Sequence, residues 1–157
     1  MQLRCPCCSH SREKVSGQHL TEDGLQRVLD HLPWCPADVT LSGIGEPLVN
    51  PKFCELVDML AERGIRCTFY TNGTLLTRHM REAILSRHNI DSLRISCDGA
   101  RKKTFENLRL GAEFESWKQS VRQFLAEAKE ERPRTLSIRV LSSCCGNFFG
   151  LRGGGRA

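Results

Sequence analysis

The sequence has no long hydrophobic run. Its 157 residues include no segment close to the roughly 20 consecutive apolar residues that a membrane-spanning helix needs. The first residues also lack the apolar centre of a secretory signal peptide. We therefore expect a cytoplasmic protein with no membrane partner.

Charge of one sign is not concentrated anywhere along the chain. The net charge is +5, but the Lys and Arg residues are scattered among acids rather than gathered in blocks. Such charge permits an anionic partner without requiring one, so we do not expect nucleic acid binding. No internal repeat is visible, and 157 residues with 39% apolar content suit one domain.

Cysteine, by contrast, is abundant, with nine in the chain. An odd count without an export signal favours reduced thiols and metal ligation over disulfides. The opening stretch MQLRCPCCSH contains Cys5-x-x-Cys8, whose spacing lets both thiolates reach one metal centre. Zinc sites, iron–sulfur clusters and redox pairs all use this spacing. A thioredoxin-like redox pair is the weakest of the three interpretations, because no strand precedes the motif.

The other cysteines have a simpler interpretation. His10 could join Cys5 and Cys8 in a zinc site, but no second clear ligand pair accompanies it. Small apolar core residues are expected where four further cysteines lie within or beside amphipathic segments: Cys35, Cys54, Cys67 and Cys97.

Apolar residues spaced three and four positions apart predict four helices. These cover residues 21–32, 50–64, 77–89 and 114–131. Asn50 is the expected N-cap of the second helix, with Pro51 as its first helical residue, and Thr77 is the expected cap of the third. The apolar stripes of the first and last helices are Leu25, Val28, Leu29 and Leu32, and Trp117, Val121, Phe124 and Ala128.

The predicted strands cover residues 39–47, 65–73, 92–99 and 135–142. Strands that alternate with amphipathic helices indicate parallel β-α units, in either a barrel or an open doubly wound sheet. Because ligands of parallel α/β folds bind at the carboxyl ends of the strands, polar turns at these ends predict a binding site. Three of the strands end in such turns, which contain Gly45-Glu46, Asn72-Gly73 and Asp98-Gly99.

Four motifs occur in one order: LRCPCCSH, LSGIGEPLVNP, TFYTNGTLL and RISCDGARKKTFENLRLGAEFESW. Together they resemble the radical S-adenosylmethionine (SAM) enzymes, and most closely the maturases that often carry a SPASM extension. The resemblance covers residues 1 to about 125. It implies an α/β fold, a partial (β/α) TIM-like barrel of about four parallel strands with outer helices.

The resemblance also implies the cofactors and the reaction. In this family a 4Fe-4S cluster, reduced by an external donor such as flavodoxin or ferredoxin, cleaves SAM to a 5′-deoxyadenosyl radical that abstracts hydrogen from substrate. We therefore expect an oxidoreductase or maturase. Its substrate is unknown, with a peptide or protein as a candidate.

Cys5 and Cys8 match the second and third cysteines of the family motif C-x-x-x-C-x-x-C. The first cysteine would fall at Met1, and a thioether is a poor substitute for a thiolate on iron. Cys7 could act as a third ligand, although adjacent side chains do not easily face one cluster corner.

The remaining site residues surround SAM in the resemblance. Gly45 and Glu46 match the turn that takes the amino group of SAM, where a carboxylate and carbonyls supply acceptors. Ser96 and Asp98 match positions that contact the ribose hydroxyls, and Asn72 lies on the rim near the same ligand.

The chain departs from the family pattern at both ends. A first strand and a sixth β-α unit are missing, and residues 143–157 form an irregular glycine- and arginine-rich tail after a core of residues 1–142. Two alternatives therefore stand beside the enzyme: a catalytically impaired fragment of one, and a zinc-binding interaction module.

Overall fold

A computed structural model describes residues 3–6, 8, 17–43, 45–133 and 135–141. The expectations for Met1, Cys7, His10 and the tail of residues 143–157 lie outside this part of the chain. Among the helices that the described residues form, none is long and apolar enough to cross a membrane.

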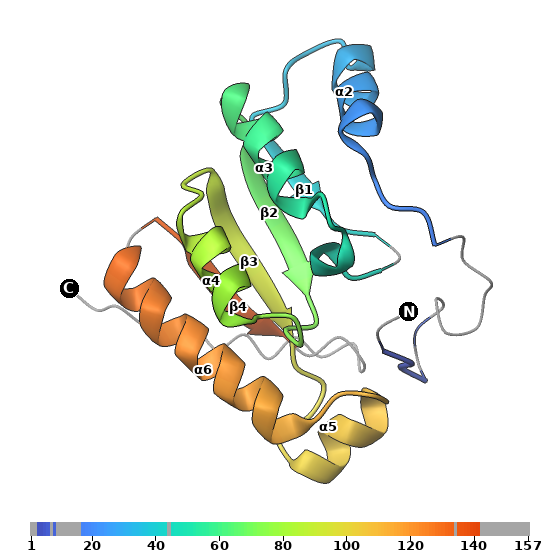
Figure 1. Ribbon diagram of the computed structural model, residues 1–157, viewed down its shortest axis with the longest axis vertical. Coiled ribbons are helices and arrows are strands. Elements are labelled where there is room, and N and C mark those ends of the chain that lie inside the picture. The colour runs from blue at the N-terminus through green and yellow to red at the C-terminus, as the bar shows by residue number, and fades with distance from the viewer. Residues whose placement is uncertain (1–2, 7, 9–16, 44, 134, 142–157) are drawn as a thin grey trace.

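Four parallel strands form one sheet, and each pairs with the strand that follows it in the chain. An open doubly wound sheet reverses its strand order and carries helices on both faces. Here the order is sequential and the helices that pack on the sheet lie on one of its faces (Figure 1). The predicted partial (β/α) barrel is therefore confirmed, with strands β1 (Asp38–Leu41), β2 (Arg66–Thr71), β3 (Ile90–Ser96) and β4 (Ser137–Leu141).

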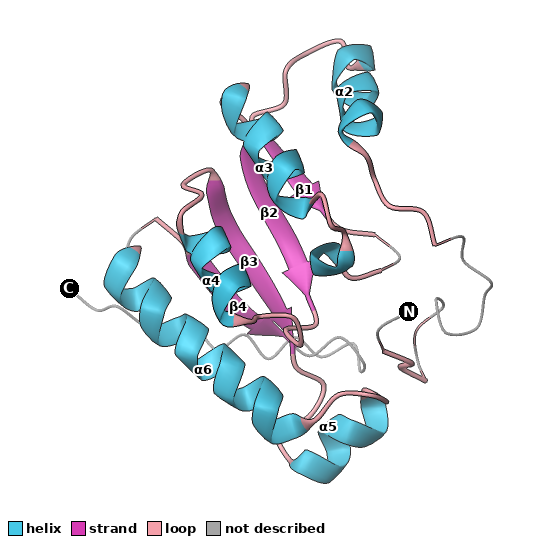
Figure 2. Cartoon of the chain, in the orientation of Figure 1, coloured by secondary structure: helices cyan, strands magenta, loops and turns pink. Residues whose placement is uncertain are grey.

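The helices alternate with these strands (Figure 2). α3, α4 and α6 cover the sheet, while α2 packs against α3, and a short 3-10 turn, η1, follows β1. Their bounds are α2 (Glu22–His31), η1 (Pro47–Val49), α3 (Phe53–Glu62), α4 (Arg78–Leu85), α5 (Lys102–Leu108) and α6 (Phe114–Glu131).

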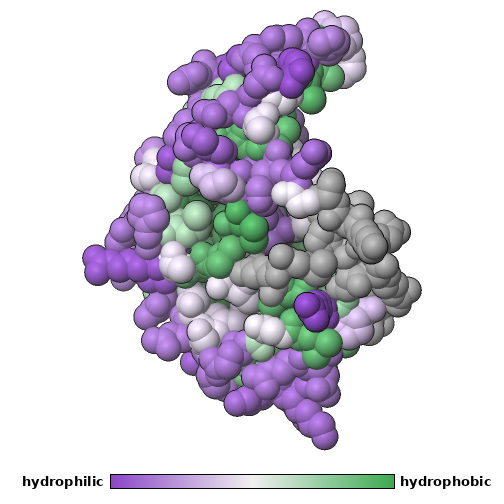
Figure 3. Space-filling model, turned by 45° about the vertical axis from the view of Figure 1, so that its right-hand side comes forward, coloured by the Kyte–Doolittle hydropathy of each residue, from purple (hydrophilic) through white to green (hydrophobic). Residues whose placement is uncertain are grey.

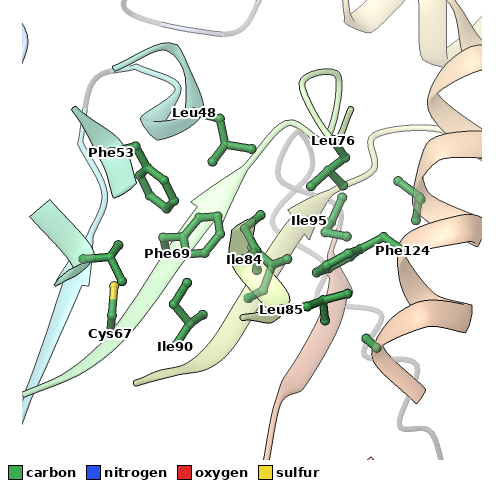
Figure 4. Packing of buried hydrophobic residues seen from close by; sticks show 14 of the residues in the cluster. Leu48, Phe53, Cys67, Phe69, Leu76, Ile84, Leu85, Ile90, Ile95 and Phe124 are labelled. Atoms are coloured by element: carbon green, nitrogen blue, oxygen red, sulfur yellow. The ribbon is translucent and has the colours of Figure 1, made fainter. Parts of the chain in front are cut away.

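The hydrophobic core lies between the sheet and these helices (Figure 4). Alternate residues of each strand point to opposite faces, so Phe69, Leu93 and Ile95 face the helices and are fully buried. The predicted stripe of α6, including Phe124, is buried against them. Packing of this face fixes which strand residues are left for the opposite face.

The opposite face of the sheet is polar. It carries Thr68 and Tyr70 on β2, which register with Ser92 and Arg94 on β3, and Arg94 registers in turn with Arg139 on β4. These side chains are partly or fully exposed. In a β-α barrel this is the inner face, where ligands have access.

Several sequence expectations are corrected. Val28 and Leu32 are exposed, because α2 meets α3 rather than the sheet and buries only Leu25 fully. Cys35 is also exposed rather than part of the core. β1, β2 and β3 are shorter than predicted at their carboxyl ends, where the polar turns leave the sheet.

The predicted helix caps fare differently. Thr77 caps α4 as expected, with its hydroxyl accepting a hydrogen bond from the Met80 N–H. Asn50 does not cap a helix that begins at Pro51. Its side chain accepts from the Lys52 N–H at 2.9 Å, so a turn intervenes and α3 begins at Phe53.

A buried arginine fastens the end of α6 to the loop between α4 and β3. Arg132 is 3% exposed, and its guanidinium donates to the carbonyl oxygens of Arg87, His88 and Ile90 at 2.9, 3.2 and 2.8 Å. The hydrogen bond to the Ile90 carbonyl is buried. The guanidinium therefore supplies a donor to a carbonyl oxygen that water cannot reach.

We predict that Arg132→Met lowers the free energy of unfolding by about 2–4 kcal/mol, because three carbonyls lose a charged donor while the aliphatic packing is kept. Urea denaturation measures the change. Arg122→Met, at an exposed position of α6, is the control and should change stability by less than about 0.5 kcal/mol. Equal stability of the two variants would contradict this role.

Candidate functional site

Glu46 lies at the carboxyl-terminal edge of the sheet, in the loop after β1 and beside the end of β2. Its Oε1 accepts from the Thr71 hydroxyl at 2.6 Å and from the Leu48 N–H at 3.3 Å, and its Oε2 accepts from the Asn72 N–H at 2.6 Å. The carboxylate thus ties the loop after β1 to the end of β2. Burial raises the pKa of Glu46, an effect that these hydrogen bonds and the nearby Arg109 oppose.

Side-chain and backbone hydrogen bonds also fix the Asn72-Gly73 turn after β2. The Asn72 side chain accepts from the Thr74 N–H at 2.9 Å, and the Asn72 carbonyl accepts from the Trp117 indole N–H, also at 2.9 Å. Gly73 has a φ of +78°, and a Cβ there would lie 2.7 Å from the Trp117 Nε1. The turn therefore requires glycine, and α6 fixes its position through Trp117.

A buried ion pair closes the edge beyond β3. The Arg109 Nη2 lies 2.6 Å from the Asp98 Oδ2, with side-chain exposures of 6% and 2%. Arg109 is also close enough to Glu46 to lower the pKa of that carboxyl. One guanidinium therefore connects the charged groups that follow β1 and β3.

The cysteine segment docks beside this ion pair. The Arg4 N–H donates to the Leu110 carbonyl at 3.0 Å, in an isolated antiparallel bridge, and the Cys8 N–H donates to the Cys5 carbonyl at 3.1 Å. The tight turn keeps Cys5 and Cys8 together, with Cys5 half-buried and Cys8 exposed. The fold thus brings the motif next to the residue that follows Arg109.

Gly45 and Ser96 complete the predicted set. Gly45 and Glu46 line a cavity of about 210 Å³ together with Gly43, Leu41 and Phe53. Ser96 is the last residue of β3 and is half-buried, two positions before Asp98.

The surface on the side of the amino-terminal segment is of mixed character. Figure 3 brings forward the side that carries the amino-terminal segment, and apolar residues gather near the middle of this face. The helical parts above and below are hydrophilic. A ligand with both apolar and charged groups suits such a surface.

The chemistry of the donors can be compared with the cofactors that the motifs imply. A carboxylate such as Glu46 fits an ammonium group, and thiolates such as Cys5 and Cys8 fit iron or zinc. Among the residues that the structure describes, no three His, Cys, Asp or Glu side chains gather in a group that could hold a metal ion. Burial raises the pKa of Cys67 to about 12 and also raises that of Cys54, so these two thiols are less suitable as ligands.

Sequence reasoning missed Thr71 and Arg109 as site residues. Thr71 directly precedes the Asn72-Gly73 turn, and that position at a strand end was a usable signal. Arg109 lies in the stretch NLRLG between two helices, where an isolated cation among apolar residues is the available clue. Its pairing with Asp98 depends on tertiary structure.

A partial parallel barrel whose polar turns and cysteine segment meet beyond the strand ends defines an α/β protein with a candidate ligand site there. The family profile described as "Radical SAM superfamily" matches residues 2–140, and the chain belongs to this superfamily. The resemblance seen in the four sequence motifs is therefore confirmed.

Two curated relatives illustrate the similarity. Over 108 residues the chain is 31% identical to the AdoMet-dependent heme synthase of Methanosarcina barkeri, covering 68% of this chain and 31% of that protein. Over 113 residues it is 28% identical to the mycofactocin maturase MftC of Mycobacterium tuberculosis, covering 72% of this chain and 29% of that protein. The chain thus spans about a third of the length of these relatives.

Solved structures share the fold. Native anSMEcpe with bound AdoMet superposes with a TM-score of 0.66 at 22% identity, covering 90% of this chain and 40% of that chain. TYW1 with a lysine-pyruvate adduct gives a TM-score of 0.56 at 21% identity, with coverages of 88% and 51%.

We predict that Glu46→Gln removes a pH dependence of stability. With a raised pKa, folded Glu46 keeps a proton that the unfolded chain releases near 4.5, so the free energy of unfolding falls as the pH rises from there through the raised value. The amide of the variant carries no such proton, and its single oxygen can still accept from Thr71 and Leu48, while the bond that Oε2 accepts from the Asn72 N–H is lost at every pH. Relative to the wild type, Glu46→Gln should therefore gain stability as the pH rises.

Urea titrations at several pH values between about 4 and 7.5 measure this difference. Glu131→Gln, at an exposed position of α6, is the matched control and should follow the wild-type curve. Parallel curves for the wild type and Glu46→Gln would show that burial does not affect the ionisation of Glu46.

Proposed function

We propose that the chain carries out radical SAM chemistry, with SAM bound at the strand ends and a 4Fe-4S cluster bound near Cys5 and Cys8. The observation that supports this most is the position of Glu46. The fold places its carboxylate beside the end of β2, oriented by Thr71 and Asn72, in a protein whose family uses this site for SAM.

In this proposal Glu46 and Gly45 accept the amino group of SAM. Glu46 needs no reorganisation for this task, because three donors already fix its carboxylate. Ser96 and Asp98 bind the ribose hydroxyls, and Asn72 lies at the same rim. The Asp98 carboxylate is positioned by Arg109, so Arg109 acts as a positioning residue.

Cys5 and Cys8 provide two thiolate ligands for the cluster. When bound and reduced, by a flavodoxin or ferredoxin, the cluster supplies the electron that cleaves SAM to the radical that takes hydrogen from substrate. The chain's own contribution is to hold the Cys5–Cys8 turn beside Leu110, through the Arg4 N–H, and so close to the Asp98–Arg109 pair.

The substrate is proposed to be a peptide. This rests on the similarity to a mycofactocin maturase and on the maturase-like motifs. Two thiols at this spacing also suit zinc, which keeps a zinc-binding module as the alternative.

Anaerobic reconstitution with iron, sulfide and dithionite tests the proposal. We predict brown cluster absorbance, bound iron and formation of 5′-deoxyadenosine from SAM in the full chain. Cys5→Ala and Cys8→Ala should each lower bound iron and product formation at least about tenfold, since a cluster with one fewer thiolate is not retained.

Cys35→Ala is the matched control, because Cys35 is exposed and lies outside the site. It should behave like the wild type. If the chain binds no iron when iron and sulfide are both supplied, the activity is ruled out for this chain. Stoichiometric binding of zinc without cluster absorbance would favour the zinc-binding module.

A further inference from the structure

Two arginines lie side by side on the face of the sheet opposite the helices. Arg94 on β3 registers directly with Arg139 on β4, and on its other side Arg94 registers with Tyr70 on β2. We refer to Tyr70, Arg94 and Arg139 as the arginine row. Neighbouring residues at one register of a sheet lie within roughly 5 Å of each other at Cβ, where like charges repel.

The Arg94 guanidinium is held in one place. Its Nη1 donates to the Tyr70 hydroxyl, and its Cζ lies 4.9 Å from the centre of the Tyr70 ring. Its Nε is buried and has no hydrogen-bond partner in the part of the chain that the structure describes. The buried Nε is not accessible from solvent, but a guanidinium that Tyr70 already holds in place is preorganised to bind an anion through its outer nitrogens.

Acids within the described residues do not neutralise the row. Neither Arg94 nor Arg139 forms an ion pair there, and Arg139 is exposed. Asp91, near the amino-terminal end of β3, accepts from the Thr68 hydroxyl at 3.3 Å and lies 3.8 Å from Arg66 instead. A bound anion would offset the repulsion between the two guanidinium groups.

We infer that the arginine row binds a carboxylate of the substrate, so that the substrate of this protein is acidic. The inference rests on the proposed function. Arg94 precedes Ser96 by two residues on the same face, which places the row roughly 7 Å further into the barrel than the predicted ribose site. A substrate carboxylate held at this depth lies beneath the strand-end ligand rather than competing with it.

Glutarate and its uncharged analogue glutaramide are suitable probes. Thermal unfolding and calorimetric titration of the full chain, at constant ionic strength, should show stabilisation and binding by glutarate but not by glutaramide. In the double variant Arg94→Gln/Arg139→Gln the dissociation constant for glutarate should rise at least about tenfold. Arg122→Gln on α6 is the control for nonspecific charge loss and should bind glutarate normally.

Equal binding of glutarate to the wild type and the double variant would overturn the inference. Tyr70→Phe provides a second check, since loss of the hydroxyl that holds Arg94 should weaken binding with the charges intact. SAM carries a carboxylate too, so the titration is repeated with saturating SAM. Simultaneous binding supports a substrate site, whereas displacement of glutarate by SAM would overturn it. Glutarate binding in a chain that does not bind SAM would instead overturn the proposed function alone.

Discussion

The carboxylate of Glu46 joins two neighbouring strand ends, and the arrangement of the site depends on it. Glu46 connects the loop after β1 to β2 by accepting hydrogen bonds from the Thr71 hydroxyl and the Asn72 N–H. Arg109, close by, extends the connection to Asp98 and, through the adjacent Leu110, to the cysteine segment. Burial disfavours each of these charged groups alone, but together they form a connected network that holds one edge of the sheet in place.

Much of the fold could be predicted from the sequence, because its helices show a regular apolar spacing. The stripe from Trp117 to Ala128 is buried as its spacing indicates, and Thr77 caps its helix. The stripe of α2 misleads at Val28 and Leu32, since spacing identifies an apolar face but not how much of that face a neighbour covers. The choice between a barrel and a doubly wound sheet also required the strand order, which local patterns do not contain.

The site residues in the turns after the strands could be predicted from the sequence, but the residues that orient them could not. Glu46, Asn72 and Asp98 follow strands, and the parallel arrangement alone brings such residues to one edge. The partners that orient them come from distant segments. Arg109 lies 11 positions after Asp98, and Trp117 lies 45 positions after Asn72, so contacts of this kind become visible only once α5 and α6 have packed.

The sequential strand order also has a consequence for how the protein is made. Every strand pairs with the one synthesised immediately before it, so the sheet can grow at one edge while the ribosome is still adding chain. Each pairing closes a loop of chain. The connection from β2 to β3 contains α4 alone, that from β1 to β2 contains η1 and α3, and that from β3 to β4 contains α5 and α6. Arg132 and β4, which carries Arg139, follow α6 directly in the chain. The contacts that attach the end of α6 to the sheet are therefore made together with the extension of the polar inner face from Arg94 to Arg139.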